Sequence, residues 1–369
     1  MTRTVLQVLP ALVSGGVERG TLEIAEALVG AGWRALVASA GGPLVEPLER
    51  LGARHVALPL GRKSPPGIWC NAAALAGLVR AEKVGIVHAR SRAPAWAALL
   101  AARRTGARLV TTYHGTYNEG WPGKRFYNSV MARGERVIAI SDFIAEHLRA
   151  RHGADPARLR VIPRGVDEQR FDPAAVSPAR VAALREAWNV PEGRPVVVLP
   201  GRLTRWKGQL VLLDAMASLP GDAIALLVGE GGLRRVLEAR IGELGLGERV
   251  RLCGHAEDVP AALLLADVAV HASTDPEAFG RTVIEAQAMA RPVIASDLGA
   301  PRETVEEGMT GWRVKPGDPA ALAEAIARAL ALPAAERAAM GARARTAVLA
   351  RYTTRAMQEA TLAVYRELP

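Results

Sequence analysis

Short apolar runs alternate with helical runs along almost the whole chain, and this rhythm restricts the fold more than any other feature. Each apolar run has the length and composition of a buried strand. The runs lie at residues 4–10, 34–38, 85–90, 108–115, 137–140, 195–200, 224–228, 251–255, 268–272 and 292–295. Helical segments such as 21–29 and 94–103 separate them. The alternation predicts βαβ units, and therefore an α/β chain of doubly wound parallel sheets. At 369 residues, two domains of ordinary size are expected.

The most informative stretch runs from residue 268 to residue 295. Its strand is followed by a loop that ends at Gly280, a helix up to Met289 and the next strand. This order leaves the free N–H groups of about Arg281 to Val283 facing the carboxyl end of the sheet. Such a helix start attracts anions, and phosphate especially.

Two carboxylates, Glu277 and Glu285, flank this predicted anion site. They would repel a phosphate, but they accept hydrogen bonds from paired sugar hydroxyls. A nucleotide-sugar, which has hydroxyls at both ends and a diphosphate between them, satisfies both requirements. Taken singly, each Glu has a simpler interpretation: Glu277 as a solvated loop residue and Glu285 as a charge near a helix N-terminus.

The spacing of Glu277 and Glu285 resembles the E-x7-E motif of retaining glycosyltransferases of family 4, which have the GT-B fold of two facing Rossmann-like domains. The resemblance implies that Glu277 holds the donor sugar and Glu285 the nucleotide ribose. The backbone between them would meet sugar and phosphate; its residues are Ala278, Phe279, Gly280, Arg281 and Thr282.

Cations suited to the diphosphate follow the strand at 195–200. Arg202 can bind a phosphate bidentately and Lys207 acts as a point charge. Their setting, Gly-Arg-Leu followed by Lys-Gly, resembles the family's phosphate-binding turn. Further donor contacts are expected at glycine turns after strands and at backbone near the base; these are Gly15, Gly16, Gly229 and His255.

The first half of the chain carries the excess positive charge. Residues 1–180 hold 25 Lys and Arg against 14 Asp and Glu, a net of +11, whereas residues 181–369 hold 22 against 23. The first half should therefore meet an anionic membrane surface, an acidic acceptor or nucleic acid. The alternative is an arginine-rich genome that places Arg on any surface.

Three residues at strand ends in this half are acceptor candidates. His114 precedes Gly115, and this pair resembles the family's His-Gly at the acceptor site; a purely structural histidine is the alternative. Arg90 and Arg92 either bind an acidic acceptor or are solvated. Residues 161–167 resemble the family's I-P-x-G-V-D segment, with Arg164 in the place of the usual Asn.

A Pro- and Ala-rich linker at 171–178 separates the expected domains. The first, residues 1–172, would bind the acceptor, and the second, 173–353, the nucleotide-sugar. The helix at 354–369 resembles the GT-B tail that returns to the first domain. The helical run 124–133, preceded by Trp121 and Pro122, either rests on a membrane interface or is an ordinary amphipathic helix.

The hypothesis is a retaining hexosyltransferase in which Glu277, Arg202, Lys207 and His114 carry catalysis. The donor would be a UDP-sugar or GDP-sugar, and the acceptor an acidic, membrane-associated glycan or glycolipid. Neither a cofactor nor a metal is expected, since the sequence lacks the Asp-x-Asp of metal-dependent sugar transferases. Residues 88–96 and 112–117 resemble bacterial lipopolysaccharide-core sugar transferases, which implies a role in lipopolysaccharide core or cell-envelope polysaccharide synthesis.

Several alternatives compete with this hypothesis. Within enzymes they are a different lipid or small-molecule acceptor, an inverting transferase and a GT-B epimerase. A nucleic-acid-binding protein fits the basic charge but lacks aromatic stacking motifs and a basic helix, so no nucleic acid is expected. A dinucleotide oxidoreductase would need the G-x-G-x-x-G that is missing. Two lone thiols, Cys70 and Cys253, suit the cytoplasm and are expected to be buried. We expect a protein at the cytoplasmic face of the inner membrane.

Overall fold

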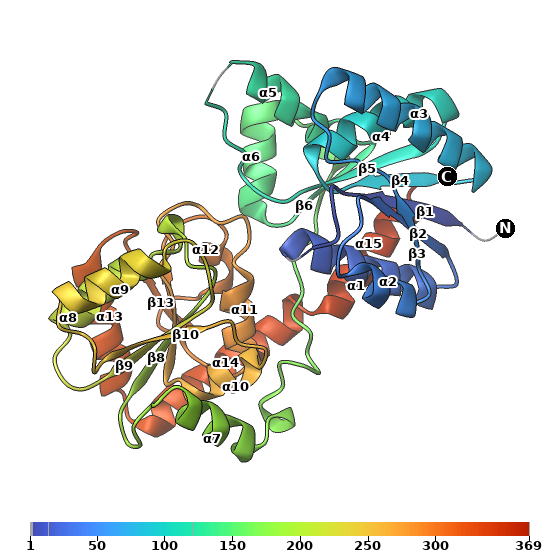
Figure 1. Cartoon of the computed structure of the whole chain (residues 1–369). Coiled ribbons are helices and arrows are strands. Elements are labelled where there is room, and N and C mark those ends of the chain that lie inside the picture. The colour runs from blue at the N-terminus through green and yellow to red at the C-terminus, as the bar shows by residue number, and fades with distance from the viewer. Residues whose placement is uncertain (1–2, 14, 121, 369) are drawn as a thin grey trace. The chain divides into compact units, whose positions relative to one another are not determined.

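The computed structural model describes residues 3–13, 15–120 and 122–368. Its contacts divide the chain into two compact units (Figure 1). The first unit comprises Met1–Arg164 and Thr354–Pro369, and the second comprises Gly165–Thr353. Residues 165–172, which follow the first unit, therefore pack with the second. Each unit has its own parallel sheet and apolar core.

The first unit contains, within the described residues, a seven-stranded sheet in the order β3-β2-β1-β4-β5-β6-β7. Every neighbouring pair is parallel. The strands are β1 (Thr4–Val8), β2 (Arg34–Ser39), β3 (Arg54–Ala57), β4 (Ile86–Ala89), β5 (Arg108–Tyr113), β6 (Arg136–Ala139) and β7 (Leu159–Val161). The helices are α1 (Gly16–Gly30), α2 (Val45–Arg50), α3 (Pro65–Ala81), α4 (Arg92–Thr105), α5 (Pro122–Asn128), α6 (Asp142–His152) and α15 (Thr354–Arg366), with short 3-10 turns at Ser129–Ala132 and Pro156–Arg158.

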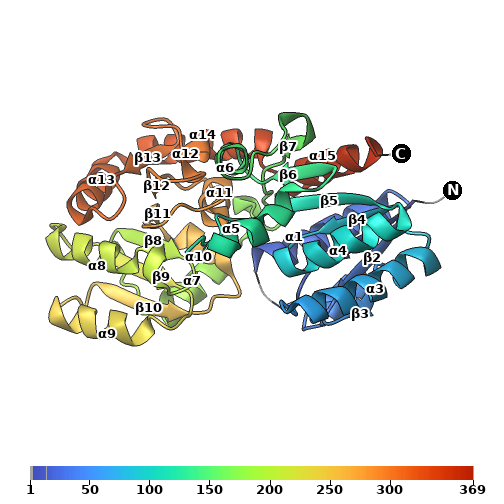
Figure 2. The ribbon, with the colours of Figure 1, turned by 90° about the horizontal axis from the view of Figure 1, so that it is seen from above.

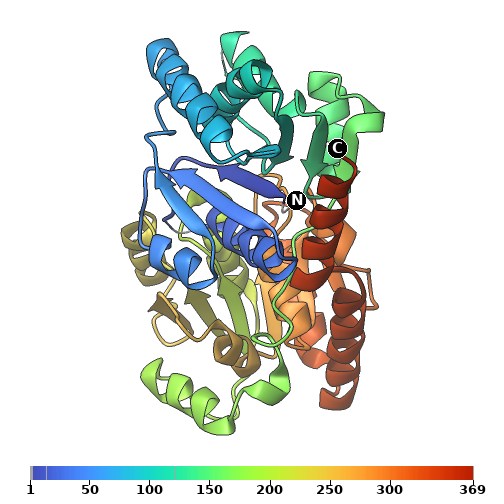
Figure 3. The same cartoon turned by 90° about the vertical axis from the view of Figure 1, so that its right-hand side faces the viewer.

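Helices cover both faces of this sheet, which explains why β1 and β4 are buried along their whole length. Figure 2 shows α3 and α4 side by side over the sheet. Figure 3 shows α15, in red, beside α1. The inner face of α15 is apolar because Met357, Leu362 and Tyr365 recur at helical spacing. The last helix of the chain thus completes the core of the first unit.

The second unit contains, among its described residues, a six-stranded parallel sheet in the order β10-β9-β8-β11-β12-β13. Its strands are β8 (Val196–Pro200), β9 (Ile224–Val228), β10 (Val250–Gly254), β11 (Val268–His271), β12 (Val293–Ser296) and β13 (Gly311–Val314). Its helices are α7 (Pro178–Ala187), α8 (Gln209–Ser218), α9 (Arg234–Glu243), α10 (Val259–Leu265), α11 (Arg281–Ala288), α12 (Pro301–Thr304), α13 (Pro319–Ala331) and α14 (Ala334–Arg351), with 3-10 turns at Pro173–Ala175 and Arg205–Lys207.

Both sheets reverse their strand order once, between β1 and β4 in the first unit and between β8 and β11 in the second. In an open α/β sheet, such a switch point separates the connecting loops and creates a crevice at the carboxyl ends of the strands. The prediction of two doubly wound parallel-sheet domains is confirmed. The topology directs the search for a site to the loops that follow β1, β4, β8 and β11.

Two sequence-based expectations concern exposure. No helix in the described part of the chain has both the length and the apolarity needed to cross a membrane. The expected burial of both cysteines is wrong for Cys70, which is exposed because it lies on the outer side of α3. Cys253 is half-buried, and burial raises the pKa of its thiol to about 12.

Candidate functional site

The switch point of the second unit brings Lys207 and Glu277 into direct contact, although 70 positions separate them in the sequence. Lys207 ends the turn after β8, and Glu277 lies in the loop after β11. The Lys207 ammonium Nζ lies 2.6 Å from Glu277 Oε1. Both side chains are largely buried, with exposed fractions of 14% and 10%. The predicted sugar-binding carboxylate and the predicted phosphate-binding cation are therefore one ion pair.

Two further side chains donate to the same carboxylate oxygen. His271 Nε2, at the end of β11, lies 2.7 Å from Glu277 Oε1, and the Ser273 hydroxyl also donates to it. Since a carboxylate only accepts, the His271 ring must carry its proton on Nε2. Glu277 Oε2 accepts no hydrogen bond within the described residues. One oxygen of the carboxylate is thus fixed by three donors, while the other is available.

The Glu277 carboxyl is held in its charged form. Burial by itself raises its pKa, but the charges and hydrogen bonds of His271 and Lys207 outweigh burial and hold the pKa well below its usual range. An acid this strong is ionised at any physiological pH. Glu277 therefore acts as a fixed hydrogen-bond acceptor and not as a general acid.

A close approach of two backbone segments makes this contact possible. Gly208, directly after Lys207, has a φ of +73°, and a Cβ added there would lie 1.8 Å from the carbonyl oxygen of Ala272. Only glycine fits that position. Beside it, the Thr274 N–H donates to the Trp206 carbonyl at 2.8 Å. The turn after β8 and the loop after β11 are locked together by their backbones.

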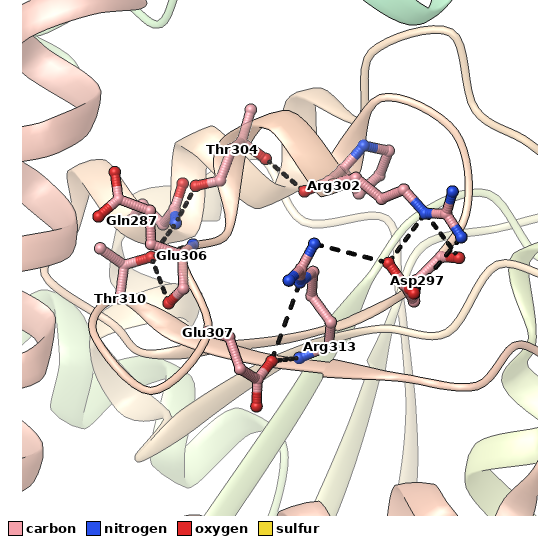
Figure 4. Close-up of polar contacts among 9 residues, drawn as sticks. Gln287, Asp297, Arg302, Thr304, Glu306, Glu307, Thr310 and Arg313 are labelled. Atoms are coloured by element: carbon pink, nitrogen blue, oxygen red, sulfur yellow. Dashed lines mark hydrogen bonds and ion pairs between the residues drawn. The ribbon is translucent and has the colours of Figure 1, made fainter.

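The loop that carries Glu277 is also fixed from its other side. Glu277 forms a β-bridge with Gly299, and the Ala300 N–H donates to the Glu277 carbonyl at 2.9 Å. Figure 4 shows how the segment after β12 is itself held: Asp297 lies between Arg302 and Arg313. The Asp297–Arg302 contact is the shorter, at 2.8 Å. The Glu277 backbone is therefore hydrogen-bonded to a segment that has ion pairs of its own.

The start of α11 differs in one detail from the sequence-based prediction. Gly280 adopts a left-handed φ of +82° immediately before the helix, as a sharp turn requires. The Val283 N–H donates to the Gly280 carbonyl at 3.0 Å, so the prediction that Val283 offers a free N–H is wrong. Arg281 and Thr282 are half-buried at the helix start, and Glu285 is half-buried in its second turn. The first turn is tightened, which uses one predicted donor internally.

Phe279 belongs to the core of the second unit. Its ring is 4% exposed and packs edge-on against Tyr352, with ring centres 5.8 Å apart. The side chain therefore anchors the loop. Phe279 and its half-buried neighbour Ala278 can meet a ligand through their backbone, which is the role that the family resemblance implied.

The remaining donor candidates lie on neighbouring turns of the same sheet edge. Arg202 is exposed, and its carbonyl accepts a hydrogen bond from the fully buried Gln209 side chain at 3.0 Å. A Cβ on Gly229 would lie 2.1 Å from the carbonyl oxygen of Gly201, so Gly229 is needed for the turns to pack. His255 is exposed just beyond β10. Arg202 thus extends into solvent from a well-supported backbone.

In the first unit, the glycine turn predicted after β1 is shorter than expected, because α1 begins at Gly16, five residues before the predicted helix at 21–29. Gly15 is the N-cap, with a φ of +149°, and Gly16 is the first helical residue. Ser14, which precedes them in the predicted turn, lies outside the described residues. A Cβ on Gly16 would meet no atom within 4 Å, so space is open above it.

His114 is in direct contact with Arg164, the residue that departs from the family pattern. Arg164 Nη2 lies 2.5 Å from His114 Nδ1. Because arginine only donates, Nδ1 must accept, and the neutral ring then carries its proton on Nε2. Arg164 is 5% exposed, and its guanidinium lies beside Gly20 of α1, where an added Cβ would be 2.3 Å from Nη1. Arg164 thereby fixes the tautomer and orientation of His114.

The two arginines after β4 have different environments. Arg90 is 2% exposed and donates to Gln7 at 2.6 Å, so the solvated alternative is wrong for it. Beside it, His88 is buried between the Tyr365 hydroxyl and Thr112, each at 2.6 Å. Burial, followed by the nearby Arg90 charge, holds the pKa of His88 well below its usual range, so this ring is neutral.

Arg92, by contrast, lies near the surface at the start of α4. Its Nη1 donates to the Asn128 side chain at 2.9 Å, and its guanidinium lies over the Tyr117 ring, 4.1 Å from the ring centre. The predicted helix 124–133 is split into α5 and the 3-10 turn that follows it. Its Phe126 is 62% exposed and lies beside the Arg133 guanidinium, whereas Trp121 lies outside the described residues.

His271 and Ser273 are the site residues that the sequence reading did not identify. His271 was included in an apolar run that predicted a strand, which was correct. A signal was present: His271 is a polar residue at the carboxyl end of a strand, and Ser273 follows two residues later. Polar residues at that position are typical of ligand sites in doubly wound folds.

Comparison with known proteins gives a consistent result for both units. A family model described as "Glycosyl transferases group 1" matches residues 181–347, and one described as "Glycosyltransferase Family 4" matches residues 14–170. A D-inositol 3-phosphate glycosyltransferase of Xylanimonas cellulosilytica is 32% identical over 359 residues, which cover 86% of this chain and 84% of that protein.

Solved structures extend this likeness to three dimensions. A glycosyltransferase from Rickettsia africae has a TM-score of 0.91 and 37% identity, with 100% of this chain and 98% of that chain covered. The Anabaena protein HepE, solved with UDP-glucose, has a TM-score of 0.85 and 26% identity, with 99% and 100% covered.

Proposed function

This chain belongs to the GT-B glycosyltransferases of group 1 and family 4, and from that premise we propose a retaining hexosyltransferase. It would move a hexose from a nucleotide-diphospho-sugar to a glycan or glycolipid acceptor. The second unit would bind the donor, and the first unit would bind the acceptor. The proposed biological role is lipopolysaccharide core or cell-envelope polysaccharide synthesis.

The observation that carries this proposal is the state of Glu277. Its Oε1 is saturated by Lys207, His271 and Ser273, while Oε2 can accept from a sugar hydroxyl. An ionised, immobile carboxylate binds a hexose in a single orientation at little entropic cost. Lys207, beside it, would face the diphosphate as charge develops on the leaving group. Arg202, exposed on the neighbouring turn, would supply the second cation, and Glu285 would bind the ribose.

The donor is proposed to be a UDP-sugar or a GDP-sugar, with no divalent metal required. HepE was solved with UDP-glucose, which supports a uridine donor. The Xylanimonas relative is named for an inositol phosphate, which supports an acidic acceptor. The basic first unit would meet that acceptor at the cytoplasmic face of an anionic membrane.

The proposal is tested by donor binding and by product analysis. UDP- or GDP-sugars should raise the Tm of the protein, and Glu277→Gln should weaken the sugar's contribution while leaving binding of the bare nucleoside diphosphate largely intact. Product NMR should show the same anomeric configuration as the donor, and EDTA should not reduce turnover. No thermal shift with any nucleotide-sugar would refute donor binding, and an inverted product would refute retention.

A further inference from the structure

Trp206 is a large aromatic residue that lies, partly exposed, beside the Lys207–Glu277 ion pair. It belongs to the 3-10 turn between β8 and α8, and it is 39% exposed. The Lys207 ammonium lies over the Trp206 ring, with Nζ 4.6 Å from the ring centre. The same Nζ is 2.6 Å from Glu277 Oε1. Lys207 therefore contacts an aromatic ring and a carboxylate at once.

The position of the Trp206 ring follows from main-chain contacts. The Trp206 carbonyl accepts a hydrogen bond from the Thr274 N–H at 2.8 Å, and the Lys207 N–H donates to the Thr204 carbonyl at 3.1 Å. The close approach at Gly208 follows directly in the chain. A substitution of the Trp206 side chain leaves all of these contacts in place, so its effect can be assigned to the ring.

The donors of the Lys207 ammonium are only partly used by the protein. An ammonium carries three N–H groups. One of them donates to Glu277, and the negative face of the Trp206 ring attracts the positive charge from another direction. In the part of the chain that the structure describes, the Lys207 side chain makes no further hydrogen bond. Because that side chain is only 14% exposed, a ligand that accepts a hydrogen bond there relieves a costly lack of solvation.

The two contacts of Lys207 differ in what they do to its charge. The Glu277 carboxylate neutralises the ammonium, whereas the ring attracts it without carrying a net charge of its own. A lysine side chain is also long and flexible, so a single ion pair leaves it several orientations. The second contact restricts those orientations before any ligand arrives, which lowers the entropic cost of binding.

We propose that Trp206 is a positioning residue for the donor: its ring holds the Lys207 ammonium so that the remaining N–H groups meet the donor's diphosphate. This inference rests on the proposed function, because that function supplies the diphosphate. Trp206 acts through Lys207 and not by contact with the nucleotide. Its side chain therefore matters only while Lys207 is present.

The test measures the affinity of the full chain for UDP and for GDP by calorimetry. Trp206→Leu should weaken whichever of them binds by about three- to tenfold, the range that a lost cation–π contact gives. Trp206→Phe keeps an aromatic face and should restore most of that loss. Trp188→Leu removes a half-buried tryptophan at the end of α7 in the same unit and should leave the affinity unchanged. Wild-type affinity in Trp206→Leu would overturn the proposal.

A double-mutant cycle shows whether Trp206 acts through Lys207. In a Lys207→Gln background, Trp206→Leu should cause no further loss of affinity. An equal loss in both backgrounds, or a loss that Trp206→Phe does not restore, would overturn the proposal, because the ring would then act directly or only support the turn. A wild-type chain that bound neither UDP nor GDP would refute the proposed function itself, whereas wild-type binding with a silent Trp206→Leu refutes this inference alone.

Discussion

The two units use their cations in opposite ways. In the second unit, Lys207 is paired at 2.6 Å with the buried carboxylate of Glu277. In the first unit, Arg92 is held by the Asn128 amide and the Tyr117 ring, both of which are neutral. A self-neutralised site suits a ligand with hydroxyls beside its phosphates, whereas an uncompensated one suits a net anion. The same doubly wound frame therefore places a cation paired with a carboxylate in one unit and a cation held by neutral groups in the other.

The largest expected effect is on catalysis by Glu277→Gln. The amide removes the charge that Lys207 and His271 both face, and it leaves those two groups partly unsatisfied. We expect kcat/KM to fall on the order of 100-fold or more, because sugar orientation depends on this carboxylate. Steady-state kinetics with the best donor checks it. Glu248→Gln, an exposed change in the same unit, is the control and should be silent. Wild-type kinetics in Glu277→Gln would remove Glu277 from the site.

The fold was predictable because the sequence shows both patterns that its elements require: apolar runs of strand length, and helical spacing in the segments between them. The apolar runs that became β1, β5, β8 and β12 are each bounded by helical or turn signals, and parallel sheets bury both faces of a strand. The predicted ends of strands and helices differ from the observed ends by a few residues. Three strands, β3, β7 and β13, were not among the predicted runs, and the last part of the helix expected over 124–133 tightens into a 3-10 turn.

The site was predictable only in part, because contacts between distant residues have no local signal. The sequence indicated that Glu277 and Lys207 both serve a donor, but not that they touch. His271 resembled any other residue of a buried strand. Likewise, the arginines at 90 and 92 looked equivalent, and only packing shows that one is in the core and the other near the surface. Tertiary packing decided each of these cases.

The next largest expected effect is on stability. It tests whether the site in the second unit depends on the close backbone contact at Gly208. Gly208→Ala should destabilise the protein by about 3 kcal/mol, because the new Cβ would strike the Ala272 carbonyl and the residue has a left-handed φ. Gly242→Ala, in α9 with open space around it, is the matched control and should be neutral or slightly stabilising. Urea unfolding measures both. Equal stability of the two variants would mean that the backbone approach at Gly208 is not rigid.

In the first unit, the counterpart of Gly208→Ala is Gly20→Ala. We expect it to change stability less and to affect acceptor binding instead. Its Cβ would meet Arg164 Nη1, the end of a flexible side chain, instead of backbone. Stability should change by less than about 1 kcal/mol, since alanine favours the helix while the arginine must shift. Moving Arg164 releases His114, so KM for the acceptor should rise several-fold with the donor KM unchanged.

A control on the same unit completes that test. Gly77→Ala, in α3 with no atom near its Cβ, should alter neither KM. If Gly20→Ala also left both KM values unchanged, then the Arg164–His114 contact would have no role in acceptor binding.

The smallest expected effect concerns an exposed carboxylate that, like Glu277, is held by basic side chains. Glu367, just after α15, is held by Arg160 and Arg136, each at 2.6 Å. The Arg160 hydrogen bond, together with that of Arg136, lowers the pKa of Glu367 to about 2. Because the folded-state pKa is depressed, the stabilisation is present above the unfolded pKa of about 4.3 and is lost as the pH falls toward 2. Glu367→Gln should cost about 1 kcal/mol at pH 7, since exposed ion pairs contribute little. Urea unfolding should show this difference shrinking between pH 5 and pH 3; a difference that stays constant with pH would mean that packing, and not charge, secures the end of α15.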